Sequence, residues 1–205
     1  WQQRRCHAAW SGHVIEDRNQ KPYELGEDHD FSELTKCTDK VACNADINGL
    51  LNYTTVIDYA AANNKELENF YPAFKAVKDY VVQAPEKTTG WYLPSIGQWY
   101  DFTANLGGLP SWDDAINEGN DLTPNLYRWS NQTELVSKIN AYFEPLGTGN
   151  YDAIPNGSYQ KFFSSSTYSD SGIWTWFVGK QANVVQCWHN VRYNSDSAVR
   201  PILAF

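Results

Sequence analysis

The sequence predicts an α+β fold, in which helices come first and antiparallel strands come last. Apolar residues recur at helical intervals in several stretches between residues 55 and 142. Residues 148–198 are instead rich in Ser, Asn, Tyr and Gly and contain alternating, strand-like runs. The chain has 205 residues and no internal repeat, so we expect a single domain over 1–205, with residues 1–50 assigned less clearly.

Two helices are predicted in the first half of the chain. Thr55 followed by Asp58 has the spacing of a capping box, which predicts the start of a helix. Pro72 favours the first position of a second helix. The apolar residues of this second helix recur at helical intervals and are Phe74, Val77 and Val81.

Two further helices have clearer ends. Ser95 is predicted to cap a helix, with its hydroxyl accepting from the amide of Gln98, and Gly107-Gly108 should end that helix. Asn131 with Glu134 predicts the start of another short helix. We expect its inner face to comprise Leu135, Ile139 and Tyr142, and its end to lie at Pro145 and Gly147.

A strand is predicted at Ile173–Val178, where side chains alternate between two faces. The bulkier set should point into the core, so Thr175 and Phe177 are expected to face solvent. A last strand is predicted at Val199–Phe205, with Pro201 at an edge or bulge. A short strand is also expected at His13–Ile15. The predicted core set of Ile173–Val178 is Trp174, Trp176 and Val178.

The charge balance argues against a protein that binds nucleic acid. Lys and Arg number 16 and Asp and Glu number 24, a net charge of −8, whereas phosphate backbones attract clustered Lys and Arg. No run of about 18 apolar residues is present, so we expect no membrane span in this chain. The chain begins at Trp1 and contains no Met, and we expect that an export signal, anchor or upstream domain has been removed.

Four cysteines allow three complete pairings, among which the sequence cannot choose. None forms a C-x-x-C motif, and no His lies at metal-ligand spacing from a Cys, so no zinc site is expected. We expect one bridge within the N-terminal set of Cys6, Cys37 and Cys43, with Cys187 left as an unpaired thiol. Such a bridge fits an oxidising location outside the cytoplasm.

Catalytic motifs are missing from the sequence. It lacks the nucleophile elbow, the dinucleotide and phosphate-binding glycine motifs, and the H-E-x-x-H zinc motif. Cys187 and His189 would share a face of a strand, but no third group that would orient the imidazole is identified. The acidic residues of 113–121 lack the ligand order of an EF-hand. We therefore expect neither an enzyme nor a metal or cofactor site.

The segment from Tyr168 to Tyr193 points to binding. It mixes Tyr, Trp and Phe with Ser, Asn, Asp, His and Arg, which is the composition of binding loops in which aromatic rings supply rigid contact area. The alternative is an ordinary β-rich surface with half-buried aromatic side chains.

Three stretches of the chain, Gly90–Ser95, Phe162–Ser169 and Val199–Phe205, resemble motifs of bacterial surface proteins with a C-type-lectin-like fold. Gly90–Ser95, followed by a Gln98-Trp99 helix, is similar to their G-W-x-L-P-[ST] motif. Phe162–Ser169 resembles Y-W-S-S-[ST]-x-Y, and Val199–Phe205 resembles a terminal V-R-P-V-x-A-F strand. The resemblance covers roughly residues 50–205 and implies helices packed on a small antiparallel sheet with long irregular loops.

The family includes variable proteins of diversity-generating retroelements, some of them surface lipoproteins or pilus-tip adhesins. The resemblance implies a non-enzymatic extracellular domain on a bacterial cell surface, in which residues 166–198 form a diversified cassette that binds a protein or glycan. The calcium-dependent sugar motifs of animal C-type lectins and the cysteine pair of formylglycine-generating enzymes are absent. The alternative is a structural or assembly module of a surface or pilus complex. The expected ligand-binding residues are Tyr168, Asp170, Thr175, Phe177, Asn183, Cys187, His189, Arg192 and Tyr193.

Overall fold

The computed structural model describes most of the chain from residue 36 onward, together with a short segment near the start. The described ranges are 8–10, 36–120, 125–147, 151–154, 159–169, 172–179, 183–191 and 197–205. The strand expected at His13–Ile15 lies outside them. None of the helices within these ranges is long and apolar enough to cross a membrane.

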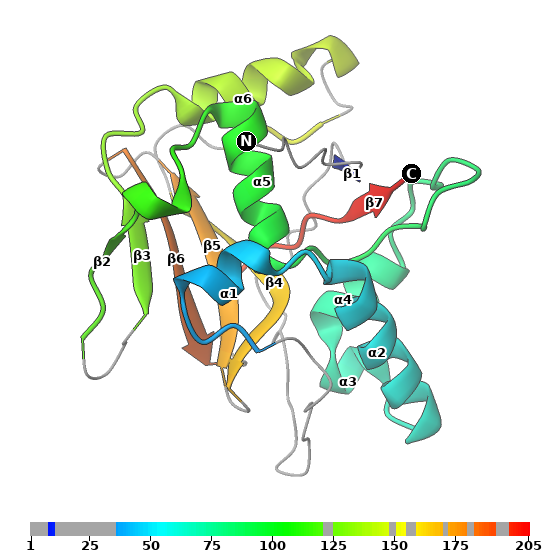
Figure 1. Cartoon of the computed structure of the whole chain (residues 1–205). Coiled ribbons are helices and arrows are strands. Elements are labelled where there is room, and N and C mark those ends of the chain that lie inside the picture. Colours follow the sequence, from blue (N-terminus) through cyan, green and yellow to red (C-terminus); the bar gives the residue numbers. More distant parts are fainter. Residues whose placement is uncertain are drawn as a thin grey trace.

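A five-stranded antiparallel sheet forms the centre of the molecule (Figure 1), and helices pack on it, so the predicted α+β class is confirmed. The strand order is β2-β3-β6-β5-β4. The predicted strand Ile173–Val178 lies within β5. The strands are β2 (Ile116–Asn117), β3 (Leu126–Trp129), β4 (Tyr159–Ser169), β5 (Gly172–Gly179) and β6 (Val184–Val191).

A second, two-stranded sheet joins the two ends of the described chain. Here β1 (Ala8–Trp10) pairs antiparallel with β7 (Ile202–Ala204). The last strand was expected over 199–205, but it begins only after Pro201, because proline cannot donate a ladder hydrogen bond. On its other side β7 is held by Tyr92, whose N–H donates to the Ile202 carbonyl at 2.8 Å.

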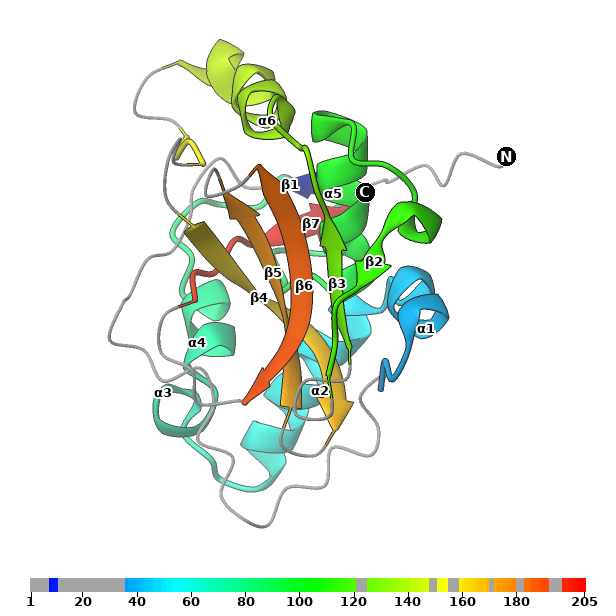
Figure 2. The same cartoon turned by 90° about the vertical axis from the view of Figure 1, so that its left-hand side faces the viewer.

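Helices pack against both faces of β4, and two neighbouring residues of this strand show how. Phe162 stacks on Trp99 of α5 with ring centroids 4.6 Å apart. Phe163 points the other way and belongs to a second core with Val56 and Phe74. In Figure 2, α4 lies to the left of β4, and α1 and α5 lie to its right. The helices are α1 (Lys40–Ala45), α2 (Gly49–Ala62), α3 (Leu67–Phe70), α4 (Pro72–Lys78), α5 (Ile96–Gly107) and α6 (Leu135–Phe143), with 3-10 turns η1 (Trp112–Asp114) and η2 (Glu144–Leu146).

The first predicted helix begins earlier than expected. Thr55 lies inside α2, which starts at Gly49 after the N-cap Asn48. Gly49 is required there because a Cβ atom would lie 2.2 Å from Gln98 Oε1, so only glycine lets α2 approach the start of α5. The capping-box spacing at Thr55 was therefore misleading.

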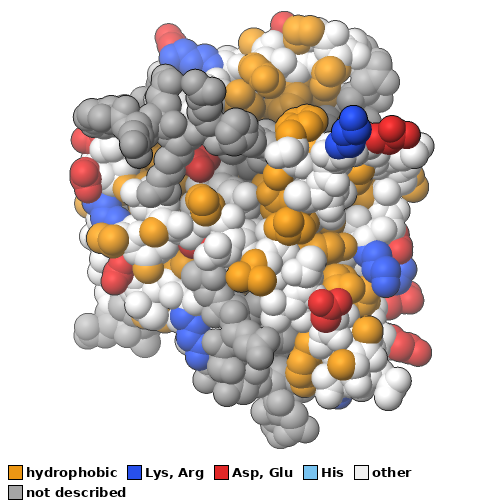
Figure 3. Space-filling view, turned by 45° about the vertical axis from the view of Figure 1, so that its right-hand side comes forward, with side chains coloured by type: hydrophobic (Ala, Val, Ile, Leu, Met, Phe, Trp, Pro, Cys, Tyr) orange, Lys and Arg blue, Asp and Glu red, His pale blue; other side chains and the backbone are white. Residues whose placement is uncertain are grey.

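Pro72 occupies the first turn of α4 as predicted, and Phe74 and Val77 are buried. Val81 was wrongly placed on the inner face: the helix ends at Lys78, and Val81 is 93% exposed. On the face shown in Figure 3, exposed hydrophobic side chains are interspersed with polar and charged ones.

Ser95 is the N-cap of α5, and the capping box with Gln98 is present, as predicted. The N–H of Ser95 donates to Gln98 Oε1 at 3.0 Å, and the Ser95 hydroxyl donates to the Asp46 carbonyl at 2.7 Å. The helix ends at Gly107, and its C-cap Gly108 adopts the left-handed conformation with φ of 76°. The local motif therefore predicted this helix correctly.

The prediction for α6 was partly right. Leu135 and Ile139 are buried, and the chain turns away at Gly147, which has a positive φ. Tyr142 is 64% exposed, and Phe143 takes the inner position instead, because it lies four residues after Ile139 on the same helix face. The helix itself begins at Leu135, with Glu134 rather than Asn131 at the N-cap.

Candidate functional site

One end of the sheet brings together segments that are far apart in the chain. Ser169 pairs with Gly172, and Gly172 pairs with Val191, so the ends of β4 and β6 meet the start of β5. The start of β3 joins them, because Leu126 pairs with Trp188. Half-buried side chains gather at this end, which we name the Tyr168–His189 end.

Tyr168 and His189 form a stacked pair at this end of the sheet. Their ring centroids lie 3.9 Å apart and the rings are inclined by only 10°. Behind them, Trp174 meets both rings edge-on, at 5.9 Å from Tyr168 and 6.0 Å from His189. The pairing of β4 with β5 shifts between Thr167 and Ser169, and a bulge of this kind redirects the side chain of the extra residue. Tyr168 is that residue.

Hydrogen bonds hold the Tyr168 hydroxyl in place. Asn125 donates from Nδ2 to the Thr38 carbonyl at 2.9 Å and to the Tyr168 hydroxyl at 3.4 Å. The Tyr127 hydroxyl donates to Asn125 Oδ1 at 3.2 Å. Burial, assisted by nearby ionisable groups, raises the pKa of Tyr127, which keeps this hydroxyl protonated and able to donate. The phenol of Tyr168 is therefore held by Asn125, which is itself anchored by Thr38 and Tyr127.

His189 is neutral at neutral pH, because burial lowers the pKa of its imidazole. Its Nε2 atom is buried and has no hydrogen-bond partner within the described part of the chain. An uncharged ring stacked on a phenol offers contact area without the desolvation cost of a charge.

Three consecutive serines of β4, Ser164–Ser166, connect this end of the sheet to the helices. The register between β4 and β5 shifts here, so that all three are buried. Ser164 donates to the Trp174 carbonyl at 2.8 Å. Ser166 accepts from the Ile96 N–H at 2.8 Å and donates to the Asp46 carboxylate. These serines fix the backbone immediately before Tyr168.

Asp46 is a buried carboxylate that sequence analysis did not identify. It accepts from the Ser166 hydroxyl, from Cys37 Sγ at 3.3 Å and from the Asn48 N–H at 3.0 Å. Burial raises its pKa, while these hydrogen bonds act in the opposite direction. No local sequence signal could have found it, since its partners lie in three separate segments.

The predicted division of β5 into an inner and an outer set was half right. Trp174, Trp176 and Val178 are fully buried, as predicted. Thr175 and Phe177 were expected in solvent, but Thr175 is fully buried and Phe177 is only 4% exposed. The ring of Trp188 lies 4.1 Å from that of Phe177, and the Lys161 amine lies 5.2 Å from the Phe177 ring. Alternation could not separate inside from outside, because the side chains of both sets are buried.

Asn183 lies at the opposite end of the sheet from Tyr168. It has a φ of 51° beside the start of β6, and its carbonyl accepts from the Gln132 N–H at 2.6 Å. The eight residues of β5 span about 23 Å at roughly 3.3 Å per residue. Asn183 is therefore remote from the Tyr168–His189 end. The expected site residues Asp170, Arg192 and Tyr193 lie outside the described residues.

The cysteines differ from expectation. Cys37, Cys43 and Cys187 are all free thiols and all buried, so the structure does not contain the expected bridge at Cys37 or Cys43. Cys6 lies outside the described residues. Cys187 is unpaired as predicted, but its placement among displayed side chains was wrong, because it lies in the aromatic core. Burial raises its pKa well above the usual value, which makes it unreactive.

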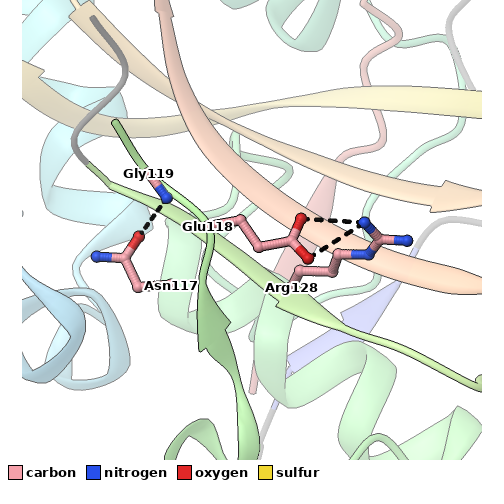
Figure 4. Close-up of polar contacts among 4 residues, drawn as sticks. All are labelled: Asn117, Glu118, Gly119 and Arg128. Atoms are coloured by element: carbon pink, nitrogen blue, oxygen red, sulfur yellow. Dashed lines mark hydrogen bonds and ion pairs between the residues drawn. The ribbon is translucent and has the colours of Figure 1, made fainter. Parts of the chain in front are cut away.

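The acidic residues before β3 are engaged in local contacts. Arg128 of β3 donates from Nη1 to both carboxylate oxygens of Glu118, at 3.0 and 3.3 Å (Figure 4). The Asn117 side chain accepts from the Gly119 N–H at 3.0 Å. Asp114 accepts from the Ser111 hydroxyl at 2.8 Å. Within the described ranges, no group of three or more His, Cys, Asp or Glu side chains could hold a metal ion.

No protein-family model, curated protein or solved structure matches this chain. The fold and the site together define an α+β domain with a half-exposed aromatic and imidazole pair held at one end of its sheet.

Proposed function

We propose that this chain is a non-enzymatic ligand-binding domain of a bacterial cell surface, and that it binds a protein or glycan through the Tyr168–His189 end. The observation that carries the proposal is the stacked Tyr168–His189 pair, which is half-buried and rests on the fully buried ring of Trp174. Aromatic side chains on a rigid support lose little conformational entropy when a ligand binds.

The packing of the three family-like stretches supports a C-type-lectin-like fold. The Ser165 N–H donates to the Pro94 carbonyl at 2.8 Å, which joins the first stretch to the second. Tyr92 and Ile202 exchange backbone hydrogen bonds at 2.8 and 3.0 Å, which joins the first to the third. Motifs that contact one another in space are more informative than motifs that merely occur in the same chain.

The buried thiols are compatible with an extracellular location. Cys37, Cys43 and Cys187 have no exposed surface, and the pKa of each is raised, by burial for Cys43 and Cys187 and chiefly by a hydrogen bond to Cys43 for Cys37. A buried thiol with a raised pKa reacts slowly with oxidants, because the thiolate is the reactive form.

The test uses arrays of glycans and of purified cell-surface proteins, probed with the labelled chain. We expect Tyr168→Ala and His189→Ala each to weaken a captured signal by about tenfold, as for side chains that anchor an interface. The control is Tyr142→Ala, which removes a well-exposed aromatic ring from α6 and should leave the signal unchanged.

Two results would contradict the proposal. One is a signal that survives both substitutions at the Tyr168–His189 end while the variants remain folded. The other is a blank result on both arrays together with self-association of the chain, which would favour the assembly module instead.

A further inference from the structure

A short series of hydrogen bonds with a fixed direction ends at the Tyr168 hydroxyl. The side-chain amide of Asn125 lies 2.9 Å from the Thr38 carbonyl, and a carbonyl oxygen can only accept. The atom beside that carbonyl must therefore be the amide nitrogen, Nδ2, which fixes the orientation of the Asn125 side chain. The same nitrogen carries a second hydrogen, which it donates to the Tyr168 hydroxyl at 3.4 Å.

The oxygen atom of the Asn125 amide agrees with this direction. Asn125 Oδ1 accepts from the Tyr127 hydroxyl at 3.2 Å. Burial raises the pKa of Tyr127, so its hydroxyl keeps the proton that it donates. Donation therefore runs from Tyr127 to Asn125 and from Asn125 to Tyr168, and the buried end of the series sets its direction.

The Tyr168 oxygen is the acceptor at the end of this series, and its own proton is left over. Within the described part of the chain, the contact with Asn125 is the one hydrogen bond that the Tyr168 hydroxyl makes. The side chain is only half-buried, so a ligand can meet it at the surface. A hydroxyl that already accepts from the protein serves an incoming partner best as a donor.

Aromatic contact area without charge lies beside this donor. The His189 ring stacks on Tyr168 with centroids 3.9 Å apart, and burial lowers the pKa of its imidazole, so the ring is neutral at neutral pH. A phenol, an amide and a neutral imidazole carry no charge. An uncharged ligand therefore suits these groups, because it brings no charge whose desolvation they would have to offset.

We propose that the Tyr168–His189 end binds an uncharged glycan, one oxygen of which accepts a hydrogen bond from the Tyr168 hydroxyl. A pyranose ring has C–H groups that can lie against the negative face of an aromatic ring, and it has hydroxyl oxygens that can accept. One sugar unit therefore meets both requirements. This inference rests on the proposed function, within which it selects a glycan over a protein, and it makes Asn125 a positioning residue that acts through Tyr168.

The experiment probes an array of uncharged and acidic glycans, and an array of cell-surface proteins, with the labelled full chain and its variants. Tyr168→Phe keeps the ring and removes only the hydroxyl. Asn125→Asp keeps the shape of the side chain but cannot donate, so the Tyr168 hydroxyl must turn its proton to the new carboxylate. We expect each substitution to weaken capture of an uncharged glycan by about tenfold, and the double variant to lose no more than Tyr168→Phe alone.

Two comparisons separate this role from a general loss of structure. The matched control is Asn140→Asp in α6, because Asn140 also donates to a carbonyl, that of Ile154, at 2.9 Å, and its substitution should leave capture unchanged. Deoxy analogues of the captured glycan supply the second comparison. Removal of the accepting oxygen should weaken capture by the unmodified chain about tenfold, whereas Tyr168→Phe should bind the parent and that analogue equally.

Each other outcome overturns part or all of the inference. Capture of acidic glycans alone, or unchanged capture of the uncharged glycan by Tyr168→Phe, would overturn the proposed ligand or its hydrogen bond. Additive losses in the double variant would show that Asn125 does not act through Tyr168. Capture on the protein array alone would reject the glycan and leave the proposed function standing. Failure of the proposed function itself is distinct, since both arrays would then stay blank.

Discussion

Two regions lie along the same strands, β4 to β6, yet differ in their exposure to solvent. Towards the interior, Trp174, Trp176 and Cys187 are fully buried in a core that also includes Trp99. At one end, Tyr168 and His189 continue the same inner face but stay half-buried. The side chains of both regions belong to the same layer, so the difference arises from what covers each one. Core aromatic residues here stabilise the fold, whereas end residues can meet a ligand.

The largest expected effect is at the centre of the core. Trp174→Ala should lower the free energy of unfolding by roughly 3–5 kcal/mol, because it removes a fully buried ring and the hydrogen bond to the Cys37 carbonyl. Urea denaturation followed by circular dichroism measures this change. A loss below about 1 kcal/mol would mean that the ring is not part of the core.

Phe177→Ala should also destabilise the fold, by about 3 kcal/mol. The sequence alone placed this ring in solvent, but it is nearly buried against Trp188. The same denaturation experiment distinguishes a buried from an exposed Phe177 ring, because unchanged stability would mean that the ring is exposed. Trp188→Ala removes the ring that covers Phe177. It should lower the free energy of unfolding by somewhat less than Phe177→Ala does.

The sequence predicted those features that depend on local contacts. The Ser95–Gln98 capping box, the proline at the start of α4 and the burial of Trp174 all follow from residues close together in the chain. The start of α2 at Gly49 was missed, because its reason is the approach of Gln98 from a distant helix.

The candidate site was only partly predictable for the same reason. Tyr168 and His189 were named from composition, and the structure brings them together. Thr175, Phe177 and Cys187 were misplaced, because a period of two does not reveal how deeply each set of side chains is buried. The buried Asp46 has no local signal, since its partners come from the segment before α1, from the loop after α1 and from β4.

A smaller effect is expected at the start of α5. Ser95→Ala should cost about 1 kcal/mol, because it removes the capping hydroxyl and leaves the Asp46 carbonyl without its donor from Ser95. The control is Ser111→Ala, a more exposed N-cap that carries a 3-10 turn, where a smaller loss is expected. Thermal denaturation of both variants measures the difference, and equal losses would contradict a special role for the Ser95–Asp46 contact.

The smallest expected effect is the pH dependence of His189. Burial lowers its pKa in the folded state, so the unfolded chain binds more protons and stability falls as pH drops below about 6.5. The partly solvated ring limits the loss to less than about 1 kcal/mol. Comparison with His189→Phe isolates this contribution from that of the other histidines. An identical pH profile for both proteins would show that His189 does not carry the effect.

Sequencing of residues 166–198 from several strains or clones tests the central claim most directly. A diversified ligand-binding surface at the end of the sheet predicts substitutions at Tyr168 and His189, with Trp174, Trp176 and Cys187 unchanged because they are buried. Variation confined to such discrete positions would support a diversified receptor. An invariant segment, or substitutions that fall on Trp174 and Trp176 as often as on Tyr168 and His189, would contradict the account.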